Sequence, residues 1–267
     1  MANIQLIATD LDGTFLSDDK SFDKALFRVV LAALKNKNIQ LAIATGVHQE
    51  RINVLLADFL DEKMAYVTNN GARVMNSDGR LIYERTIAMP ILQNVQQLLA
   101  DFPVKPSRGL VYSTDDTAYV PRAYADTIRN SRRRYFKRII LFDDLAEINE
   151  PIFKVTMNWQ DFDETQFYDA AQRILGDSVH ITETGTGAID IVPAGVNKAT
   201  GLKALAGNIG ISMDSIAAFG DGENDLEMLR AVGQPFVMPG ASIVGPFAPV
   251  MADNNHAGVL KTILSII

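Results

Sequence analysis

The stretch Asp10-Leu11-Asp12-Gly13-Thr14 constrains this chain more than any other. It follows an apolar run at 4–9, too short for a helix and typical of a buried parallel strand, and ligands bind at the carboxyl ends of such strands. A strand repeat of two places Asp10 and Asp12 on one side of the backbone, and Gly13 lets the chain turn away. Because neighbouring carboxylates repel each other unless a cation or proton intervenes, the pair indicates a functional site, although an N-cap and turn would use the same residue types.

The composition narrows the class of protein. A chain of 267 residues suffices for one large domain or two smaller ones, and a net charge of −7 argues against nucleic-acid binding. The absence of Cys excludes disulfides, thiolate catalysis and Cys-ligated zinc, and three separated His residues leave little for a His-rich metal site. Oxygen ligands remain, and these suit Mg²⁺.

The N-terminus lacks the basic segment of a secretory signal, and acidic residues directly follow its short apolar run. No uninterrupted apolar stretch approaches the roughly 18 residues of a membrane helix. The sequence therefore predicts a cytoplasmic protein with no membrane segment, and nothing in it indicates an obligate protein partner.

Strand-like runs alternate with helix-like stretches in the first part of the chain. Strands are expected at 4–9, 39–44 and 65–68, and helices at 21–34, with Ser21 as N-cap, and at 51–60. This order predicts parallel strands joined by right-handed crossovers. The turn sequence at 76–79 then predicts a β-hairpin between 72–75 and 80–83.

The next part of the chain lacks strands that end in acidic residues. Helices are expected there at 91–100, 123–137 and 164–175, and strands at 110–113, 118–120, 153–159 and 179–184. We predict an α/β fold with a parallel-sheet core, residues 1–83 and 191–267, and a second α+β unit inserted into it, residues 84–190. The basic run Arg129, Arg132, Arg133, Arg134, Lys137 and Arg138 is interpreted as a solvated helix face rather than an anion site.

The chain returns to the core after the insert. A helix is expected from about Lys198 to 205, followed by a strand at 215–219 that ends in Gly220-Asp221-Gly222-Glu223-Asn224-Asp225. The last strands are expected at 236–238 and 250–252, and the last helix at 258–267.

Acidic side chains follow the first and a later core strand, so they are expected at one edge of the sheet. We predict that Asp10, Asp12 and Asp221 bind one Mg²⁺, Asp12 through its main-chain carbonyl rather than its side chain. Asp225 is expected to support the metal site, with Asn224 beside it.

Neutral donors and one cation complete the predicted site. Thr45, the amide of Gly46 and the ammonium of Lys198 are expected to bind phosphate. Each signal is weak alone, because Thr-Gly pairs cap helices, single Lys residues lie on surfaces, and Asn69-Asn70-Gly71 is a common turn. Their order along the chain, each after a strand, is what indicates phosphoryl transfer.

The two N-terminal acids then have distinct chemical roles. Asp10 is expected to attack phosphorus and form an aspartyl-phosphate, which divides a difficult hydrolysis into two steps. Asp12 is expected to protonate the leaving alkoxide and then to deprotonate the incoming water.

The motifs at 10–14, 45–46, 198 and 220–225 resemble those of the haloacid-dehalogenase-like superfamily, in its Cof-type sugar phosphatase branch. The resemblance implies a Rossmann-like core with a cap inserted after the third core strand, Mg²⁺, hydrolysis of small phosphorylated metabolites, and contact of Asn224 with phosphate or nucleophile. Many members carry Arg where this chain has Val47, and Gly where it has Ala199. The sequences at 197–199 and 253–256 are closer to the sugar phosphatase subgroup, so sugar phosphates are the expected substrates.

Two alternatives use the same residues. A phosphomutase would transfer the aspartyl-phosphate to a second sugar hydroxyl instead of water, and a phosphate-ligand sensor would bind without turnover. Retention of both Asp10 and Asp12 argues against the sensor. Substrate choice is expected to depend on the cap loop at 185–187, and Lys198 is expected to matter unusually because Val47 supplies no charge.

Overall fold

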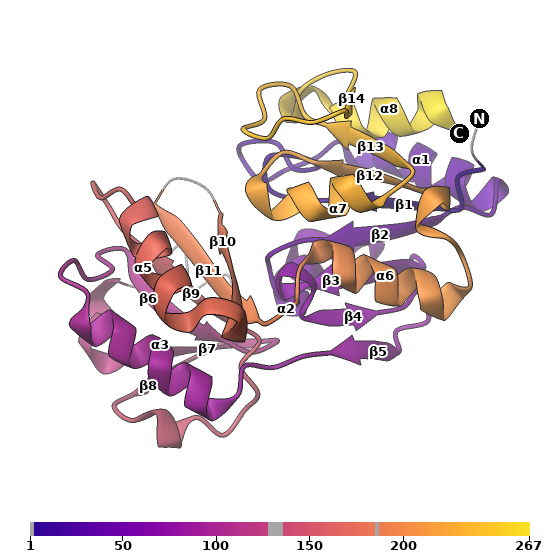
Figure 1. The fold of residues 1–267 in the computed structure, drawn as a ribbon. Coiled ribbons are helices and arrows are strands. Elements are labelled where there is room, and N and C mark those ends of the chain that lie inside the picture. Colours follow the sequence, from indigo (N-terminus) through magenta and orange to yellow (C-terminus); the bar gives the residue numbers. More distant parts are fainter. Residues whose placement is uncertain (1–2, 128–135, 185–186) are drawn as a thin grey trace. The chain divides into compact units, whose positions relative to one another are not determined.

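The structure, a computed structural model, describes residues 3–127, 136–184 and 187–267. It divides into two compact units (Figure 1). The core unit comprises Met1–Gly46, Asp58–Glu84 and Asn197–Ile267, and the insert unit comprises Val47–Ala57 and Arg85–Val196.

The core unit is built on an eight-stranded sheet with the order β14-β13-β12-β1-β2-β3-β4-β5. Its strands are β1 Leu6–Thr9, β2 Gln40–Ala44, β3 Met64–Thr68, β4 Arg73–Met75, β5 Leu81–Glu84, β12 Ile216–Gly220, β13 Gln234–Val237 and β14 Ala248–Pro249. The strands from β14 to β3 run parallel, and β3, β4 and β5 pair antiparallel, as the predicted hairpin requires. The α/β, Rossmann-like prediction is confirmed.

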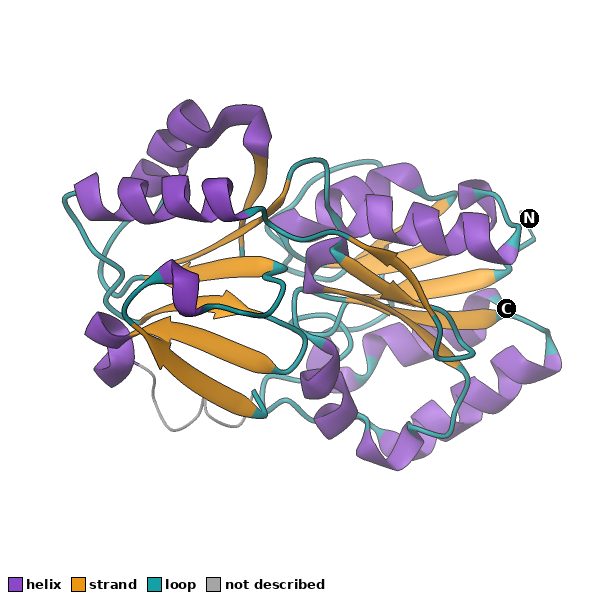
Figure 2. Cartoon of the chain, turned by 90° about the horizontal axis from the view of Figure 1, so that it is seen from below, coloured by secondary structure: helices purple, strands orange, loops and turns teal. Residues whose placement is uncertain are grey.

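The central strands are buried along their whole length, which explains their continuous apolar sequences. Helices cover both faces of the sheet (Figure 2). They are α1 Lys24–Asn36, α6 Lys198–Ile209, α7 Leu226–Ala231 and α8 Gly258–Ile266. Helix α6 packs on α7 and α1 packs on α8, so the sheet is enclosed as a parallel sheet must be.

Helix α1 begins later than predicted. Asp23 is the N-cap, and its side chain accepts from the amide of Leu26. Ser21 was expected in this role, but its hydroxyl bonds Ser17 and Asp19 instead, within the preceding loop. The helix therefore begins where a free carboxylate can satisfy its first amides.

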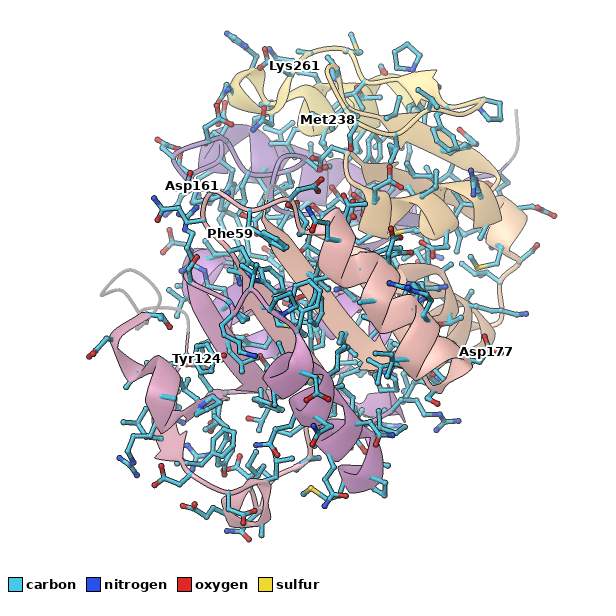
Figure 3. All side chains as sticks on the ribbon, turned by 60° about the vertical axis from the view of Figure 1, so that its left-hand side comes forward. Phe59, Tyr124, Asp161, Asp177, Met238 and Lys261 are labelled. Carbon is cyan, nitrogen blue, oxygen red and sulfur yellow. The ribbon has the colours of Figure 1, made fainter. Side chains whose placement is uncertain are left out.

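An aromatic cluster ties the loop after β1 to α1. The ring of Phe27 lies 5.1 Å from that of Phe15 and 4.8 Å from that of Phe59, which Figure 3 labels. Phe22 completes the cluster at 5.0 Å from Phe15, and the guanidinium of Arg28 lies 4.8 Å from the centre of the Phe59 ring. The loop that begins at Asp10 is therefore anchored at its far end by packing.

Short 3₁₀ segments join many of the elements. In the core unit they are η2 Asn69–Gly71, η6 Met213–Ser215, η7 Glu223–Asp225 and η8 Asn254–His256. In the insert unit they are η3 Arg122–Thr127, η4 Leu145–Glu147 and η5 Gly176–Ser178. The remaining segment, η1 Ala57–Phe59, begins in the insert unit and ends in the core unit.

The insert unit contains a six-stranded sheet with the order β10-β11-β9-β6-β7-β8, antiparallel except between β7 and β8. Its elements are α2 Gln49–Leu55, α3 Met89–Asp101, β6 Gly109–Ser113, β7 Thr117–Pro121, β8 Arg138–Phe142, β9 Lys154–Asn158, α5 Thr165–Leu175, β10 Val179–Glu183 and β11 Ala188–Pro193. Helices α3 and α5 pack on each other and share one apolar core with the sheet.

The helix predicted at 123–137 is wrong in its described part. Residues 122–127 form a 3₁₀ segment, residues 128–135, with four of the basic run, lie outside the described residues, and Arg138 begins β8. The Arg138 guanidinium bonds Asp116 at 3.2 Å and Glu150 at 2.9 Å. Arg138 thus lies in a strand and pairs with acidic residues outside the strands, and it is not part of a helix.

The expected strand at 250–252 is also wrong, because the strand next to β13 is the shorter β14 at 248–249. The expected insert boundary at 190 falls inside β11, which pairs with β9 as far as Ile191 and with β10 as far as Pro193. The assignment of 84–190 as a cap domain stays a prediction. Within the described residues, no helix combines the length and apolar character needed to cross a membrane.

Candidate functional site

Strand β1 ends at Thr9, and the two N-terminal acids follow it in a turn. The main-chain amide of Asp10 still donates to the carbonyl of Phe219 at 3.0 Å, and Asp10 is only 5% exposed. Asp12 is exposed, and its carboxylate pairs with Lys20 at 2.7 Å. The two acids therefore differ in environment, because strand periodicity no longer applies after the chain leaves the sheet.

Gly13 and Thr14 join this turn to the loop after β12. Gly13 has a φ of +83°, and a Cβ built on it would overlap the carboxylate of Asp221. The Thr14 hydroxyl donates to Asp221 Oδ1 at 2.6 Å. Only glycine satisfies both the left-handed backbone and the close approach of Asp221.

Asp225 organises the loop that carries Asp221. Its Oδ2 accepts from the amides of Asp221 at 3.0 Å and Gly222 at 3.1 Å. Oδ1 of Asp225 accepts from Lys198 Nζ at 2.6 Å, and a Cβ built on Gly220 would lie 2.5 Å from the Cβ of Asp225. Asp225 thus fixes the direction of the chain at the end of β12.

Lys198 is the first residue of α6 and is fully buried. The helix begins at a capping box in which the Asn197 side chain accepts from the Thr200 amide at 2.8 Å, and the Thr200 hydroxyl accepts from the Asn197 amide at 3.0 Å. The Lys198 ammonium lies 2.6 Å from oxygens of both Asp10 and Asp225. The reading of a lone Lys as a surface residue is thereby excluded.

Burial governs the charges of the site. It opposes the charge of Lys198, but Asp10 and Asp225 outweigh it and raise the pKa of the ammonium. Burial also raises the pKa of Asp10 well above its usual range, and that of Asp221 to a lesser degree. The negative charge of these carboxylates therefore exceeds the single positive charge of Lys198.

This excess of negative charge fits a hard divalent cation. Oxygens of Asp10, Asp221 and Asp225 lie within 4.8 Å of one another. Carboxylate oxygens are the ligands that Mg²⁺ prefers. The predicted set includes Asp12 only through its main-chain carbonyl, and the Asp12 side chain, which pairs with Lys20, is not in this group.

Thr45 and Gly46 follow β2 in the same unit, and Thr45 is buried. They do not cap α2, because the N-cap is His48, whose ring accepts from the amide of Arg51. The carbonyl of Thr45 accepts from the amide of Asn70 at 3.1 Å. The structure therefore brings the loops after β2 and β3 together.

Asn224 donates through Nδ2 to Asn70 Oδ1 at 3.2 Å. The sequence alone predicts only a turn at Asn70 and no role for Thr14. A signal existed for each: Thr14 belongs to the 10–14 motif, and consecutive Asn-Asn-Gly is the composition expected of a left-handed loop. Neither signal reveals the long-range partner.

Comparison with known proteins identifies relatives over nearly the whole chain. A family model described as haloacid dehalogenase-like hydrolase matches residues 7–263. The chain is 30% identical over 263 residues to the 5-amino-6-(5-phospho-D-ribitylamino)uracil phosphatase YbjI of Escherichia coli strain K12, covering 98% of this chain and 95% of the relative. It is 27% identical to an HMP-PP phosphatase of Escherichia coli O157:H7, covering 89% and 85%.

Solved structures share the fold. SMU.1108c from Streptococcus mutans UA159 superposes with a TM-score of 0.88 at 24% identity, covering 98% of both chains. BT4131, described as a sugar phosphatase of haloacid dehalogenase subclass IIB, superposes with a TM-score of 0.80 at 19% identity and the same coverage.

Proposed function

The chain belongs to the haloacid dehalogenase-like hydrolases, and we propose that it is a Mg²⁺-dependent phosphatase of sugar phosphates that works through an aspartyl-phosphate on Asp10. The observation that carries the proposal is the position of Lys198, which is fully buried and 2.6 Å from both Asp10 and Asp225. An ammonium group placed beside a buried candidate nucleophile can hold a phosphate dianion against the charge of that nucleophile.

The metal requirement follows from the charges of the site. Asp10, Asp221 and the main-chain carbonyl of Asp12 would hold the ion, with Asp225 supporting the loop of Asp221. When bound, Mg²⁺ would offset the repulsion between the carboxylates and the incoming phosphate.

The protein groups then divide the reaction into two displacements. A carboxylate oxygen of Asp10 attacks phosphorus, the bond to the ester oxygen breaks, and Asp12 donates a proton to the departing alkoxide. Asp12 next takes a proton from water, whose oxygen attacks the aspartyl-phosphate and releases inorganic phosphate and the Asp10 carboxylate. The exposed Asp12–Lys20 ion pair is worth at most about 1 kcal/mol, so it opens readily for these steps.

Thr45, the amide of Gly46, Lys198 and Asn224 bind the phosphate oxygens in this proposal. Thr45 is buried at the end of β2, and Lys198 is buried at the start of α6. Carboxyl ends of parallel strands and helix starts are the places where α/β sheets bind phosphate.

Sugar phosphates are proposed because two independent comparisons point to hydroxylated leaving groups. The E. coli relative carries a phosphoribityl group in the name of its substrate, and the BT4131 structure is described as a sugar phosphatase. We place the selection of the leaving group in the insert unit. Residues 185–186 of the expected selective loop lie outside the described residues.

The sheet of the insert offers a polar cluster for this selection. Asp190 accepts from Lys154 Nζ at 2.8 Å and from Thr156 Oγ1 at 2.6 Å. Alternation along the strands places these side chains on the face opposite the apolar core that includes α3 and α5. A Thr156→Val variant should change the ranking of sugar phosphates and leave the rate on an aryl phosphate near that of the wild type.

The decisive experiment measures phosphate release with Mg²⁺ and in chelator, across sugar phosphates, polyol phosphates and one aryl phosphate. We expect metal-dependent release, abolished by Asp10→Asn and lowered by roughly two to four powers of ten in Asp12→Asn. Isomerised sugar phosphate without release would identify a phosphomutase. Tight phosphate binding with no turnover of any ester would identify a sensor and overturn the proposal.

A further inference from the structure

The loop η2, Asn69–Gly71, has an unusual backbone. Asn69, Asn70 and Gly71 all have positive φ values, of 51°, 54° and 95°. Positive φ is uncommon outside glycine, and such conformations persist only where the surroundings over-determine them, often at functional sites. Three in succession indicate that tertiary contacts hold this loop.

The loop is also buried at a cost. Asn69 is 0% exposed, and neither polar atom of its side chain has a hydrogen-bond partner among the described parts of the chain. Asn70 is 2% exposed. The side chain of Asn69 therefore does not hold the loop through hydrogen bonds to these residues.

Asn70 contacts two of the segments proposed to bind phosphate. The main-chain amide of Asn70 donates to the carbonyl of Thr45 at 3.1 Å. The side-chain Oδ1 of Asn70 accepts from Asn224 Nδ2 at 3.2 Å. A Cβ on Gly46 would lie 2.8 Å from the same Oδ1. The Asn70 side chain thus fills the space between the ends of β2 and β12.

The third phosphate-binding segment touches the same loop. A Cβ on Gly71 would overlap the carbonyl oxygen of Asn197, the N-cap of α6. One turn further along α6, a Cβ on Gly201 would lie 3.0 Å from the Cα of Gly71. The close approach of glycine to glycine sets the depth at which α6 presents Lys198.

We propose that Asn70 is a positioning residue for the phosphate site, which sets Asn224 and the Thr45–Gly46 turn relative to Lys198. This rests on the proposed phosphatase function. Asn70 acts through these groups and takes no part in bond making or breaking, so its loss weakens phosphate binding in the substrate complex and the transition state alike. Such a loss raises KM and leaves kcat nearly unchanged.

The test compares Asn70→Gly with Asn38→Gly. Glycine accepts the left-handed backbone, so Asn70→Gly removes the amide side chain without adding strain. Asn38 has the same φ of 54° but is exposed at the end of α1, so Asn38→Gly reproduces the backbone change away from the site. We measure kcat, KM, the inhibition constant of inorganic phosphate, and Tm.

We expect Asn70→Gly to raise KM and the phosphate inhibition constant together by about tenfold, the factor associated with one hydrogen bond, with kcat within about threefold. Asn38→Gly should match the wild type. In a double-mutant cycle with Asn224→Ala, the combined loss should be clearly smaller than the sum, because one residue acts through the other.

Three results would overturn the inference. They are an inhibition constant unchanged from Asn38→Gly, a fall in kcat and Tm with phosphate binding intact, and strict additivity with Asn224→Ala. If Asn70→Gly does not fold, Asn70→Ala also removes the Oδ1 acceptor and must show the same split between KM and kcat. Absence of turnover in the wild type would reject the proposed function alone, since phosphate binding by thermal shift still tests Asn70.

Discussion

The ammonium of Lys198 lies 2.6 Å from a carboxylate oxygen of Asp10 and 2.6 Å from one of Asp225. The residues come from the turn after β1, from α6 and from the loop after β12, which are far apart in sequence. The contact therefore forms only when the core unit has folded and these three segments have come together. Lys198 therefore stabilises the core unit and is also the proposed phosphate ligand.

Replacement of Lys198 by Met should affect both roles. Removing one partner of a buried ion pair leaves uncompensated carboxylates, so the free energy of unfolding should fall by about 3 to 5 kcal/mol in chelator. Saturating Mg²⁺ should restore part of this loss, and the inhibition constant of inorganic phosphate should rise at least about tenfold because a charged donor is lost. Chemical denaturation and phosphate inhibition measure the two effects.

Lys203→Met is the matched control, because Lys203 is exposed on the same helix. It should leave stability and phosphate affinity unchanged. If Lys198→Met also binds phosphate as the wild type does, Lys198 is not the phosphate ligand.

Asp221→Asn should raise the Mg²⁺ concentration needed for half-maximal activity by tenfold or more. The substitution removes one of the charges in the carboxylate group but keeps a side chain able to accept from Thr14. Glu223→Gln removes a charge from an exposed position in the same loop and should leave the metal requirement unchanged. Equal shifts in both variants would mean that the general field of the loop, rather than ligation by Asp221, determines the metal requirement.

Gly13→Ala tests the contact between the loops after β1 and β12. Gly13 and Gly79 have similar φ values, +83° and +75°, but a Cβ on Gly79 meets no described atom within 4 Å. Gly79→Ala should cost about 1 to 2 kcal/mol through the left-handed backbone alone. Gly13→Ala should cost clearly more and weaken Mg²⁺ activation, because its Cβ displaces Asp221. Equal losses of stability with normal activation would show that Asp221 can move without consequence.

The sequence predicted the core better than the insert for a physical reason. Strands such as β1 and β12 are buried on both faces, so their composition alone identifies them. Strand β8, which begins at Arg138 and was not predicted, depends on pairing with distant residues, which periodicity does not encode. At the site, residue types and order located Asp10, Lys198 and the loop of Asp221.

What the sequence could not provide were contacts formed only by the fold. The exposure of Asp12 follows from the end of the strand at Thr9, three residues earlier in the chain, and Asn70 is buried where it contacts the loops after β2 and β12. Both depend on where a strand ends, and this is the least predictable feature of an element.

Hydrogen bonds to the carboxylate of Asp18 should make a pH-dependent contribution to the stability of the fold. Asn254 Nδ2 donates to Asp18 Oδ1 at 3.0 Å, and Asn255 Nδ2 donates to Oδ2 at 3.0 Å. These two hydrogen bonds hold the pKa of Asp18 below its ordinary value, and the bond from Asn254 has the larger effect. A carboxyl with a lowered folded-state pKa stabilises the fold above its unfolded pKa of about 3.9, and this stabilisation is lost as the pH falls through the folded-state value.

An Asn255→Ala variant should therefore be less stable than the wild type near pH 7, and the difference should shrink as the pH falls below about 4. NMR titration should show the pKa of Asp18 rising toward its ordinary value. Asp19 is an internal control, because hydrogen bonds from Ser17 and Ser21 lower its pKa to about 2 without help from Asn255. A stability difference that persists unchanged at low pH would show that Asn255 acts through packing or through its bond to the Asp18 amide, at 3.0 Å, and not through the carboxylate.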